Sequence, residues 1–317
     1  MSIVTKTKSL LVIMGPTSSG KSSLAIEIAK RWNGEIISAD SRQVYRGMDI
    51  GTGKVTEEEQ EEAHHHLLDV ADPNDDYNVS HFVHDAHMAL EDISSRKKLP
   101  IICGGTGFWI QALVENQELP SVPPDPALRK ALSKKTIEEL LEILIKLDPE
   151  CTEKIDKKNP RRLIRAIEIA QDPNYKLQVI NYKKTKQRNN QLLLALCPQK
   201  DILDARIRAR LETRFNQGMI EEVARLQSEG VSWERLDAFG LEYRWISRYL
   251  RKALSLEEMK EKLYFDSIHY GKRQMTWIRR WQRLGAPIHI IETPEEAMKI
   301  AEEFLKKEDC PKTLSGS

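Results

Sequence analysis

The chain lacks the features that would give it a disulfide framework or place it in a membrane. Its 317 residues include four cysteines, far apart and none in a Cys-x-x-Cys pair, which argues against both a cysteine-rich zinc module and a disulfide scaffold. No apolar run approaches the roughly 20 residues that a membrane-spanning helix needs. Residues 1–8 lack the apolar core of a signal peptide. These absences predict a cytoplasmic protein with no membrane contact.

An excess of charge of one sign is also missing. The net charge is +1, so any surface for nucleic acid must arise from local clusters of Lys and Arg. One such cluster is residues 272–283, with five basic and no acidic side chains. The acidic run Glu57–Glu62 is most simply a solvated helix face.

Short apolar runs alternate with amphipathic segments along the first part of the chain. The runs predict buried strands at residues 10–14, 35–38 and 100–103, and the helical spacing predicts helices at 21–31 and 79–93. This alternation is typical of an α/β fold with a parallel sheet flanked by helices. A later apolar run predicts a strand at 192–197, and residues 201–229 and 256–284 are expected to form two long helices.

Proline marks a change of character after residue 119. The segment 120–126 contains Pro120, Pro123, Pro124 and Pro126; it cannot be a helix interior and is interpreted as a linker. Residues 127–170 are helical in pattern, without a strand. We therefore predict an all-helical insertion at 120–191, which interrupts an α/β core formed by 1–119 and 192–311, and a flexible tail at 312–317.

A phosphate-binding motif follows the first predicted strand. The segment matches G-x-x-x-x-G-K-[ST] and opens a helix, which is the context that this motif requires. Backbone N–H groups and the helix N-terminus bind phosphate oxygens in such loops. A chance match at an ordinary turn is the weaker alternative, so the core is expected to be P-loop NTPase-like. The predicted diphosphate ligands are Gly15, Pro16, Thr17, Ser18, Ser19, Gly20, Lys21 and Ser22, and Ser22 is also expected to bind Mg²⁺.

The loop alone predicts a diphosphate or triphosphate, without selecting a reaction. A typical kinase or ATPase holds magnesium with a carboxylate at the end of a core strand, but the run 100–103 ends in Gly-Gly-Thr. The carboxylate that does follow a strand is Asp40. Ligands of open α/β sheets bind beyond the carboxyl ends of strands, so Asp40 is expected to face the phosphates. The alternative for Asp40 is a helix N-cap or a turn.

Five blocks, in order, resemble the tRNA dimethylallyltransferase family: the phosphate loop, residues 38–45 with 47–54, then 104–106, 159–166 and 272–281. The resemblance implies transfer of a dimethylallyl group from dimethylallyl diphosphate to N6 of adenosine 37 in a tRNA, beside the anticodon, with Mg²⁺. It makes Asp40 the general base, with orientation of N6 by hydrogen bonding as the alternative role for this carboxylate. It makes Thr106 a hydrogen-bond donor to the oxygen that leaves with the diphosphate. The implied diphosphate-binding cations are Lys21, Arg165 and Arg210, with Arg214 one turn further on.

The resemblance also implies how RNA is recognised. A stacked adenine must be extruded to reach a buried site, and RNA loops are read by stacking and by contacts to base edges. Trp277 and Trp281, four residues apart, also suit the core face of a helix, and we expect them to pack inward while the neighbouring cations reach RNA. The predicted contacts to the anticodon stem-loop are Asp40, Ser41, Arg42, Gln43, Thr106, Arg129, Arg161, Arg162, Lys272, Arg273, Gln274, Thr276, Trp277 and Arg279.

Three rival functions remain open from sequence: a small-molecule kinase, a prenyltransferase for free adenine nucleotides, and a non-catalytic RNA-binding ATPase. The insertion and the basic C-terminal segment favour tRNA. The chain departs from the family's Gly-Tyr-Arg-like segment at residues 239–244. The run His64–His66 lacks the pattern of a zinc site. No feature requires more than a monomer.

Overall fold

The computed structural model describes residues 9–117, 119–120, 122–172 and 190–309. Two compact units are present, one made of residues 1–115 with 187–317 and the other of residues 116–186. The junctions predicted from sequence are 119/120 and 191/192. The predicted tail, 312–317, lies outside the described residues. Within the described ranges, no helix combines the length and the apolar character that crossing a membrane demands.

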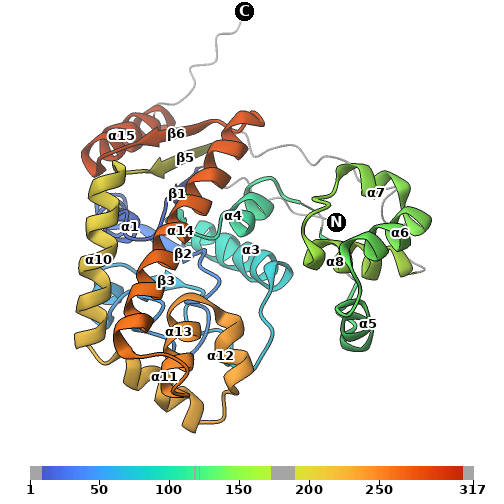
Figure 1. The fold of residues 1–317 in the computed structure, drawn as a ribbon. Helices are drawn as coiled ribbons and strands as arrows, with labels where there is room; N and C mark the ends of the chain where they lie inside the picture. Colours follow the sequence, from blue (N-terminus) through green and yellow to red (C-terminus); the bar gives the residue numbers. More distant parts are fainter. Residues whose placement is uncertain (1–8, 118, 121, 173–189, 310–317) are drawn as a thin grey trace, which may run out of the picture. The chain divides into compact units, whose positions relative to one another are not determined.

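The first unit is built on a six-stranded parallel sheet, as predicted (Figure 1). The strand order is β3-β2-β4-β1-β5-β6, and every neighbouring pair is parallel. The strands are β1 (Leu10–Met14), β2 (Gly34–Ser38), β3 (His65–His66), β4 (Leu99–Gly104), β5 (Gln191–Leu196) and β6 (Ile288–Ile291).

Both faces of the sheet are covered, because successive strand residues point to opposite sides. Leu10, Val12 and Met14 pack into one apolar cluster, whereas Leu11 and Ile13 pack into another. The second cluster lies under α1 (Lys21–Arg31) and α15 (Pro294–Asp309). The first lies under α3 (Val79–Ser95), α4 (Gly107–Val114), α10 (Lys200–Asn216), α11 (Met219–Ser228), α12 (Trp233–Phe239), α13 (Leu241–Leu250) and α14 (Leu256–Arg283).

Two predictions about single helices can be compared with the structure: the acidic run at 57–62 and the long helix at 201–229. The acidic run forms α2 (Glu57–Glu62), which buries no residue and begins with a capping box between Thr56 and Glu59. The prediction of one long helix at 201–229 is wrong, because α10 ends at Asn216 and α11 starts at Met219. Gly218, between them, has φ +95°, a left-handed conformation that glycine adopts readily and that ends a helix.

The second unit is helical, in agreement with the pattern at 127–170. Its helices are α5 (Pro126–Leu132), α6 (Ile137–Leu147), α7 (Pro149–Lys154) and α8 (Pro160–Gln171). Leu140 and Leu144 of α6 pack with Leu163 and Ile167 of α8 in a small core. Pro126, assigned to the linker from sequence, begins α5, because proline suits the first turn of a helix.

The strand order brings three loops to one edge of the sheet. β4 lies between β1 and β2, with Met14 paired to Gly104 and Ser38 paired to Cys103. The phosphate loop follows β1, Asp40 follows β2, and Thr106 follows β4. All three segments therefore meet at the carboxyl edge of the sheet, where open α/β folds bind their ligands.

Candidate active site

A cavity of about 490 Å³ lies at this edge, within the first unit. The phosphate loop contributes Thr17, Ser18, Gly20, Lys21 and Ser22 to its lining, while Gly15, Pro16 and Ser19 are buried. The segment after β2 and the helices of the other face supply the remaining walls, which include Asp40, Arg42, Gln43, Gly51, Thr52, Gly53, Lys54, Arg206, Arg210, Arg214, Glu242, Tyr270 and Gln274.

The phosphate loop leads directly into α1, which starts at Lys21. The ammonium of Lys21 lies 3.4 Å from the carbonyl oxygen of Pro16. Burial is the main cause that lowers the pKa of Lys21 below its ordinary value, and the nearby Arg210 lowers it as well. A buried cation next to further cations is stabilised by an anion, so this part of the cavity suits a diphosphate.

Asp40 follows β2 and Thr106 follows the neighbouring strand β4. A hydrogen bond between Thr106 and Ser41, the residue after Asp40, connects the two loops. The Oγ1 of Thr106 accepts the backbone N–H of Ser41 at 3.0 Å, and the N–H of Thr106 donates to the carbonyl of Ala39 at 3.2 Å. Because the threonine oxygen accepts that bond, its own O–H is left to donate. Asp40 accepts the N–H of Arg42 at 2.9 Å, so it shapes its turn and also lines the cavity.

Three arginines of α10 form the opposite wall. Arg206, Arg210 and Arg214 are four residues apart, a spacing that places them on one helix face. Arg210 donates to the Oγ1 of Thr17 and to the carbonyl of Gly53, both at 3.3 Å. Arg206, which the sequence analysis missed, donates to the carbonyl of Ser19 at 3.2 Å; the four-residue spacing before Arg210 was the available signal.

Positive charge dominates the cavity. Burial lowers the pKa of Arg210 to about 10, with Arg214 as a further cause. Arg214 pairs with Glu242 at 3.1 Å, and burial raises the pKa of Glu242 above its ordinary value. Three carboxylates, Asp40, Glu59 and Glu242, face six cationic side chains: Lys21, Arg42, Lys54, Arg206, Arg210 and Arg214.

The two residues predicted to read base edges are anchored by the protein. The Nε of Arg42 donates to the carbonyl of Phe239 at 2.9 Å, and its guanidinium lies 5.4 Å from the Phe239 ring centre. Gln43 accepts the hydroxyl proton of Ser38 at 3.2 Å and donates to the carbonyl of Gly53 at 3.1 Å. Both side chains line the cavity, and their contacts restrict them to one orientation.

Helix α14 divides the predicted RNA-binding residues between two faces. Lys272, Arg273, Thr276 and Arg279 are exposed. Trp277 lies 5.1 Å from the ring of Trp281, which is 2% exposed and donates its indole N–H to Glu115. The expected inward packing of the tryptophans is thus present, and contact of the exposed cations with RNA stays a prediction.

The second unit holds the remaining predicted cations. Arg129 and Arg165 both pair with the buried carboxylate of Glu168, and Arg165 also donates to the carbonyl of Val122 at 2.8 Å. Arg161 and Arg162 are exposed on α8. The diphosphate role of Arg165 and the RNA roles of Arg129, Arg161 and Arg162 stay predictions.

The histidine run contributes to an ion-pair cluster at the opposite edge of the sheet. Glu35, at the start of β2, is 2% exposed and accepts from His66 and Lys98, each at 2.7 Å, and from Arg96. The Arg96 hydrogen bond is the main cause that lowers the pKa of Glu35. His64 lies near enough to complete a group of three possible metal ligands. The cations already bound to Glu35 compete with a metal ion for its oxygens.

Comparison with known families identifies the chain. The model of a family described as IPP transferase matches residues 43–281, and that of Isopentenyl transferase matches residues 8–73. The chain belongs to the IPP transferase family. This IPP transferase is 42% identical over 296 residues to tRNA dimethylallyltransferase 1 of Syntrophus aciditrophicus (strain SB), covering 92% of this chain and 96% of that protein. It is 42% identical over 288 residues to tRNA dimethylallyltransferase 2 of Treponema denticola, covering 89% and 95% of the two chains.

Solved structures agree with the family and with its fold. The full-length tRNA isopentenylpyrophosphate transferase of Bacillus halodurans has a TM-score of 0.70 at 31% identity, over 95% of this IPP transferase and 98% of that chain. A eukaryotic dimethylallyltransferase, captured acting on tRNA, has a TM-score of 0.80 at 25% identity, over 94% and 80% of the chains. The predicted P-loop-type α/β fold is confirmed.

Proposed function

We propose that this IPP transferase moves a dimethylallyl group from dimethylallyl diphosphate to N6 of adenosine 37 in a tRNA and releases diphosphate. The relatives that are called tRNA dimethylallyltransferases span nearly the whole chain, which supports the reaction class. The observation that carries the proposal is that Asp40 lines the cavity together with the phosphate loop, while Thr106 accepts a hydrogen bond from the residue after Asp40, Ser41. This arrangement combines a proton acceptor, a hydroxyl donor and a cationic phosphate site in one place.

The reaction needs one bond to form and one to break. N6 of the adenine attacks the first carbon of the dimethylallyl group, and the bond from that carbon to the diphosphate oxygen breaks, with its electron pair leaving on the oxygen. Asp40 accepts the proton that N6 loses, a task that a positioned carboxylate can perform. The O–H of Thr106 donates to the departing oxygen and binds it more strongly as negative charge develops there.

The cations of the cavity stabilise the leaving group. Lys21, Arg210 and Arg214 surround the space between the phosphate loop and α10, and their charge favours the released diphosphate over a neutral ligand. Arg210 already contacts Thr17 of the phosphate loop. In this proposal these side chains bind and orient the donor without exchanging protons with it.

The donor atoms at the phosphate end also suit Mg²⁺. Ser22 and Asp40 both line the cavity and offer a hydroxyl and a carboxylate oxygen, and Mg²⁺ prefers such hard oxygen ligands together with substrate phosphates. When bound, the ion would supply positive charge at the diphosphate oxygens. Ser22 would hold it, and Asp40, which follows β2, would face it.

Electrostatics favour an RNA acceptor over a free nucleotide. Lys272, Arg273, Arg279 and Arg280 are exposed along α14, whereas Gln274 and Tyr270 of the same helix face the cavity. One helix thus offers cations for a phosphate backbone and also borders the site in which a base would react. Backbone phosphates supply most of the salt-sensitive affinity of nucleic-acid complexes.

Mass spectrometry of the acceptor tests the function. The full chain is incubated with unmodified tRNA, Mg²⁺ and dimethylallyl diphosphate, with AMP as an alternative acceptor and ATP as an alternative donor. We expect tRNA to gain the mass of one dimethylallyl group, and AMP to stay unchanged. Modified AMP with unmodified tRNA would establish a nucleotide prenyltransferase instead. ATP consumption without prenyl transfer would establish a kinase or ATPase.

A further inference from the structure

A short segment without helix or strand, residues 47–54, forms one wall of the cavity. Hydrogen bonds between its own residues hold it together. The N–H of Gly53 donates to the carbonyl of Ile50 at 3.1 Å, and the N–H of Lys54 donates to that of Asp49 at 3.0 Å. The hydroxyl of Thr52 donates to the carbonyl of Met48 at 2.7 Å. We call this segment the wall loop. Its internal bonds make it one compact turn.

The wall loop is bound from behind by one buried carboxylate, Glu222 of α11, which is 5% exposed. Its Oε2 accepts the N–H of Asp49 at 2.9 Å and that of Ile50 at 2.7 Å. Its Oε1 accepts the N–H of Gly51 at 3.0 Å and the hydroxyl of Tyr243 at 2.8 Å. Three consecutive N–H groups that converge on an anion form a nest, and hydrogen bonds to a charged acceptor are among the stronger ones.

The other side of the wall loop holds the arginines of the diphosphate site. Arg214 donates to the carbonyl of Gly51, and Arg210 donates to the carbonyl of Gly53, both at 3.3 Å. A Cβ on Gly53 would lie 1.6 Å from one nitrogen of Arg214 and 2.0 Å from one of Arg210, and this glycine has φ +60°. Glycine is therefore required there, because the guanidinium groups occupy the space of a side chain.

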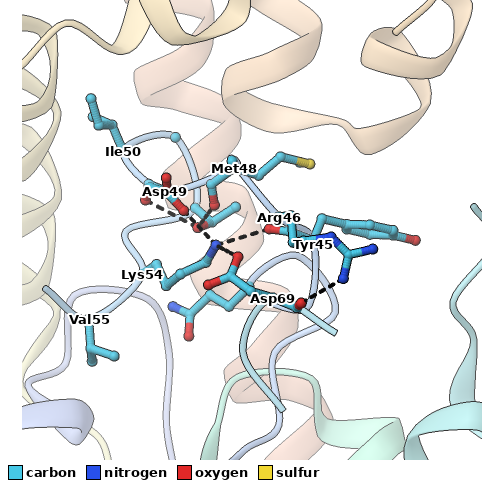
Figure 2. A network of polar contacts seen from close by, with 12 residues as sticks. Tyr45, Arg46, Met48, Asp49, Ile50, Lys54, Val55 and Asp69 are labelled. Carbon is cyan, nitrogen blue, oxygen red and sulfur yellow. Dashed lines mark hydrogen bonds and ion pairs between the residues drawn. The ribbon is translucent and has the colours of Figure 1, made fainter. Parts of the chain in front are cut away.

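A second anchor holds the base of the wall loop (Figure 2). The ammonium of Lys54, whose side chain is 4% exposed, donates to the carbonyl of Tyr45 at 2.9 Å and to Asp49 and Asp69 at 2.5 Å each. Arg46 donates to the carbonyl of Asp69 at 2.9 Å in the same network. Lys54 thus ties one end of the loop to Asp49 within it and to Tyr45 and Asp69 outside it.

We infer that Glu222 is a positioning residue: it orients three N–H groups of the wall loop so that the carbonyls of Gly51 and Gly53 hold Arg214 and Arg210 at the diphosphate. This inference rests on the proposed function, since it takes the cavity to be the diphosphate site. Glu222 itself lies behind the loop, outside the residues that line the cavity. Its replacement by Gln keeps the size of the side chain but puts an N–H₂ group where backbone N–H groups need an acceptor.

Calorimetric binding of inorganic pyrophosphate in Mg²⁺ buffer tests the inference on the full chain. The matched control is Glu35→Gln, which removes another buried carboxylate of the same unit, at the opposite edge of the sheet. We expect Glu222→Gln to weaken pyrophosphate binding by about tenfold, the scale of one hydrogen bond to a charged group. Glu35→Gln should bind as the wild type does.

Steady-state kinetics separate positioning from a general loss of folded protein. We expect Glu222→Gln to raise the KM for dimethylallyl diphosphate and to leave the KM for tRNA unchanged, whereas partial unfolding would lower kcat alone. Tyr243→Phe removes one of the four hydrogen bonds to Glu222 and should act in the same direction, more weakly, even if Glu222→Gln does not fold. Equal pyrophosphate affinity in the wild type, Glu222→Gln and Tyr243→Phe would overturn the inference. A wild-type chain that binds no pyrophosphate would overturn the proposed donor site instead.

Discussion

Gln274 of α14 joins the phosphate loop to the loop that carries Thr106. Its Oε1 accepts the backbone N–H of Thr17 at 2.8 Å, and its Nε2 donates to the carbonyl of Gly105 at 3.0 Å. The neighbours Lys272 and Arg273 are exposed on the same helix. A helix with cations on its outer face thus sets, through one amide on its inner face, the separation of two catalytic loops.

Replacement of Gln274 by Ala should therefore reduce kcat/KM for dimethylallyl diphosphate. The backbone N–H of Thr17 and the carbonyl of Gly105, both partly buried, lose their partner, and we expect a loss of about tenfold or more. Gln282→Ala is the matched control, since that glutamine of the same helix donates to the carbonyl of Ile288, away from the cavity. Equal kinetics for the two variants would show that Gln274 is not needed to position the loops.

Asp40→Asn tests the proton acceptor. Asparagine retains an oxygen for the N–H of Arg42, which Asp40 accepts at 2.9 Å, so the turn should persist while basicity is lost. We expect single-turnover prenyl transfer to fall by about 10² to 10⁴, with tRNA affinity nearly unchanged in a filter-binding assay. Unchanged turnover would remove Asp40 as the base.

Thr106→Ala and Thr106→Ser distinguish leaving-group stabilisation from binding. Serine preserves a hydroxyl that can accept the N–H of Ser41, whereas alanine removes it. Thr106→Ala should lower kcat by about 10² to 10³ with little change in the Kd for pyrophosphate, and Thr106→Ser should retain most activity. If kcat and pyrophosphate affinity fell together in Thr106→Ala, its role would be confined to binding.

The salt dependence of tRNA binding tests the exposed face of α14. Replacing Arg279 and Arg280 by Gln should reduce the slope of log K against log salt concentration by about 1.5, as expected for two lost phosphate contacts. Lys30 and Arg31, exposed at the end of α1 away from the phosphate loop, provide the control pair. An unchanged slope in the α14 variant would place the RNA on another surface.

Acid should loosen the second unit through Glu168. Burial alone would raise the pKa of this carboxyl, but hydrogen bonds from Arg129, Asp125 and Arg165 lower it to about 2, from an ordinary value of 4.5. The unfolded chain thus binds more protons between these values, so the stabilisation is complete above about pH 4.5 and is lost as pH falls through about 2.

Hydrogen exchange of the α8 amides, corrected for intrinsic rates, measures this effect. We expect protection in the wild type to fall between about pH 4.5 and pH 2 more steeply than in Glu168→Gln, whose side chain does not titrate. Glu142→Gln, at an exposed position of α6, should behave as the wild type does. The same pH dependence in the wild type and Glu168→Gln would refute this account.

Local patterns were sufficient to predict much of the architecture. The apolar runs around β1, β2, β4 and β5 are short and continuous, as buried parallel strands require. The glycine-rich loop between β1 and α1 matches a complete phosphate-binding motif in the required strand–helix context, and this match located the phosphate site. β3 consists of His65 and His66 and has no apolar signal, and β6 is a four-residue strand whose isoleucines are interrupted by His289; both were missed.

Other features depend on contacts between residues far apart in sequence. Glu222 and the wall loop are separated by about 170 positions, and neither has a local pattern that indicates the other. The break between α10 and α11 lies at Gly218, and this glycine was the local signal that the prediction of one helix did not use. Gln274 was predicted from resemblance as an RNA contact, whereas its hydrogen bonds inside the protein could be found only in three dimensions.

The most direct test of the central claim counts both products of one reaction. Unmodified tRNA and dimethylallyl diphosphate are incubated with the full chain; released pyrophosphate is measured, and the digested tRNA is analysed for N6-dimethylallyladenosine and its position. The account predicts one pyrophosphate for each modified adenosine, with the modification at position 37 and both products lost together in Asp40→Asn. Pyrophosphate release without modified adenosine, or modification that persists in Asp40→Asn, would contradict it.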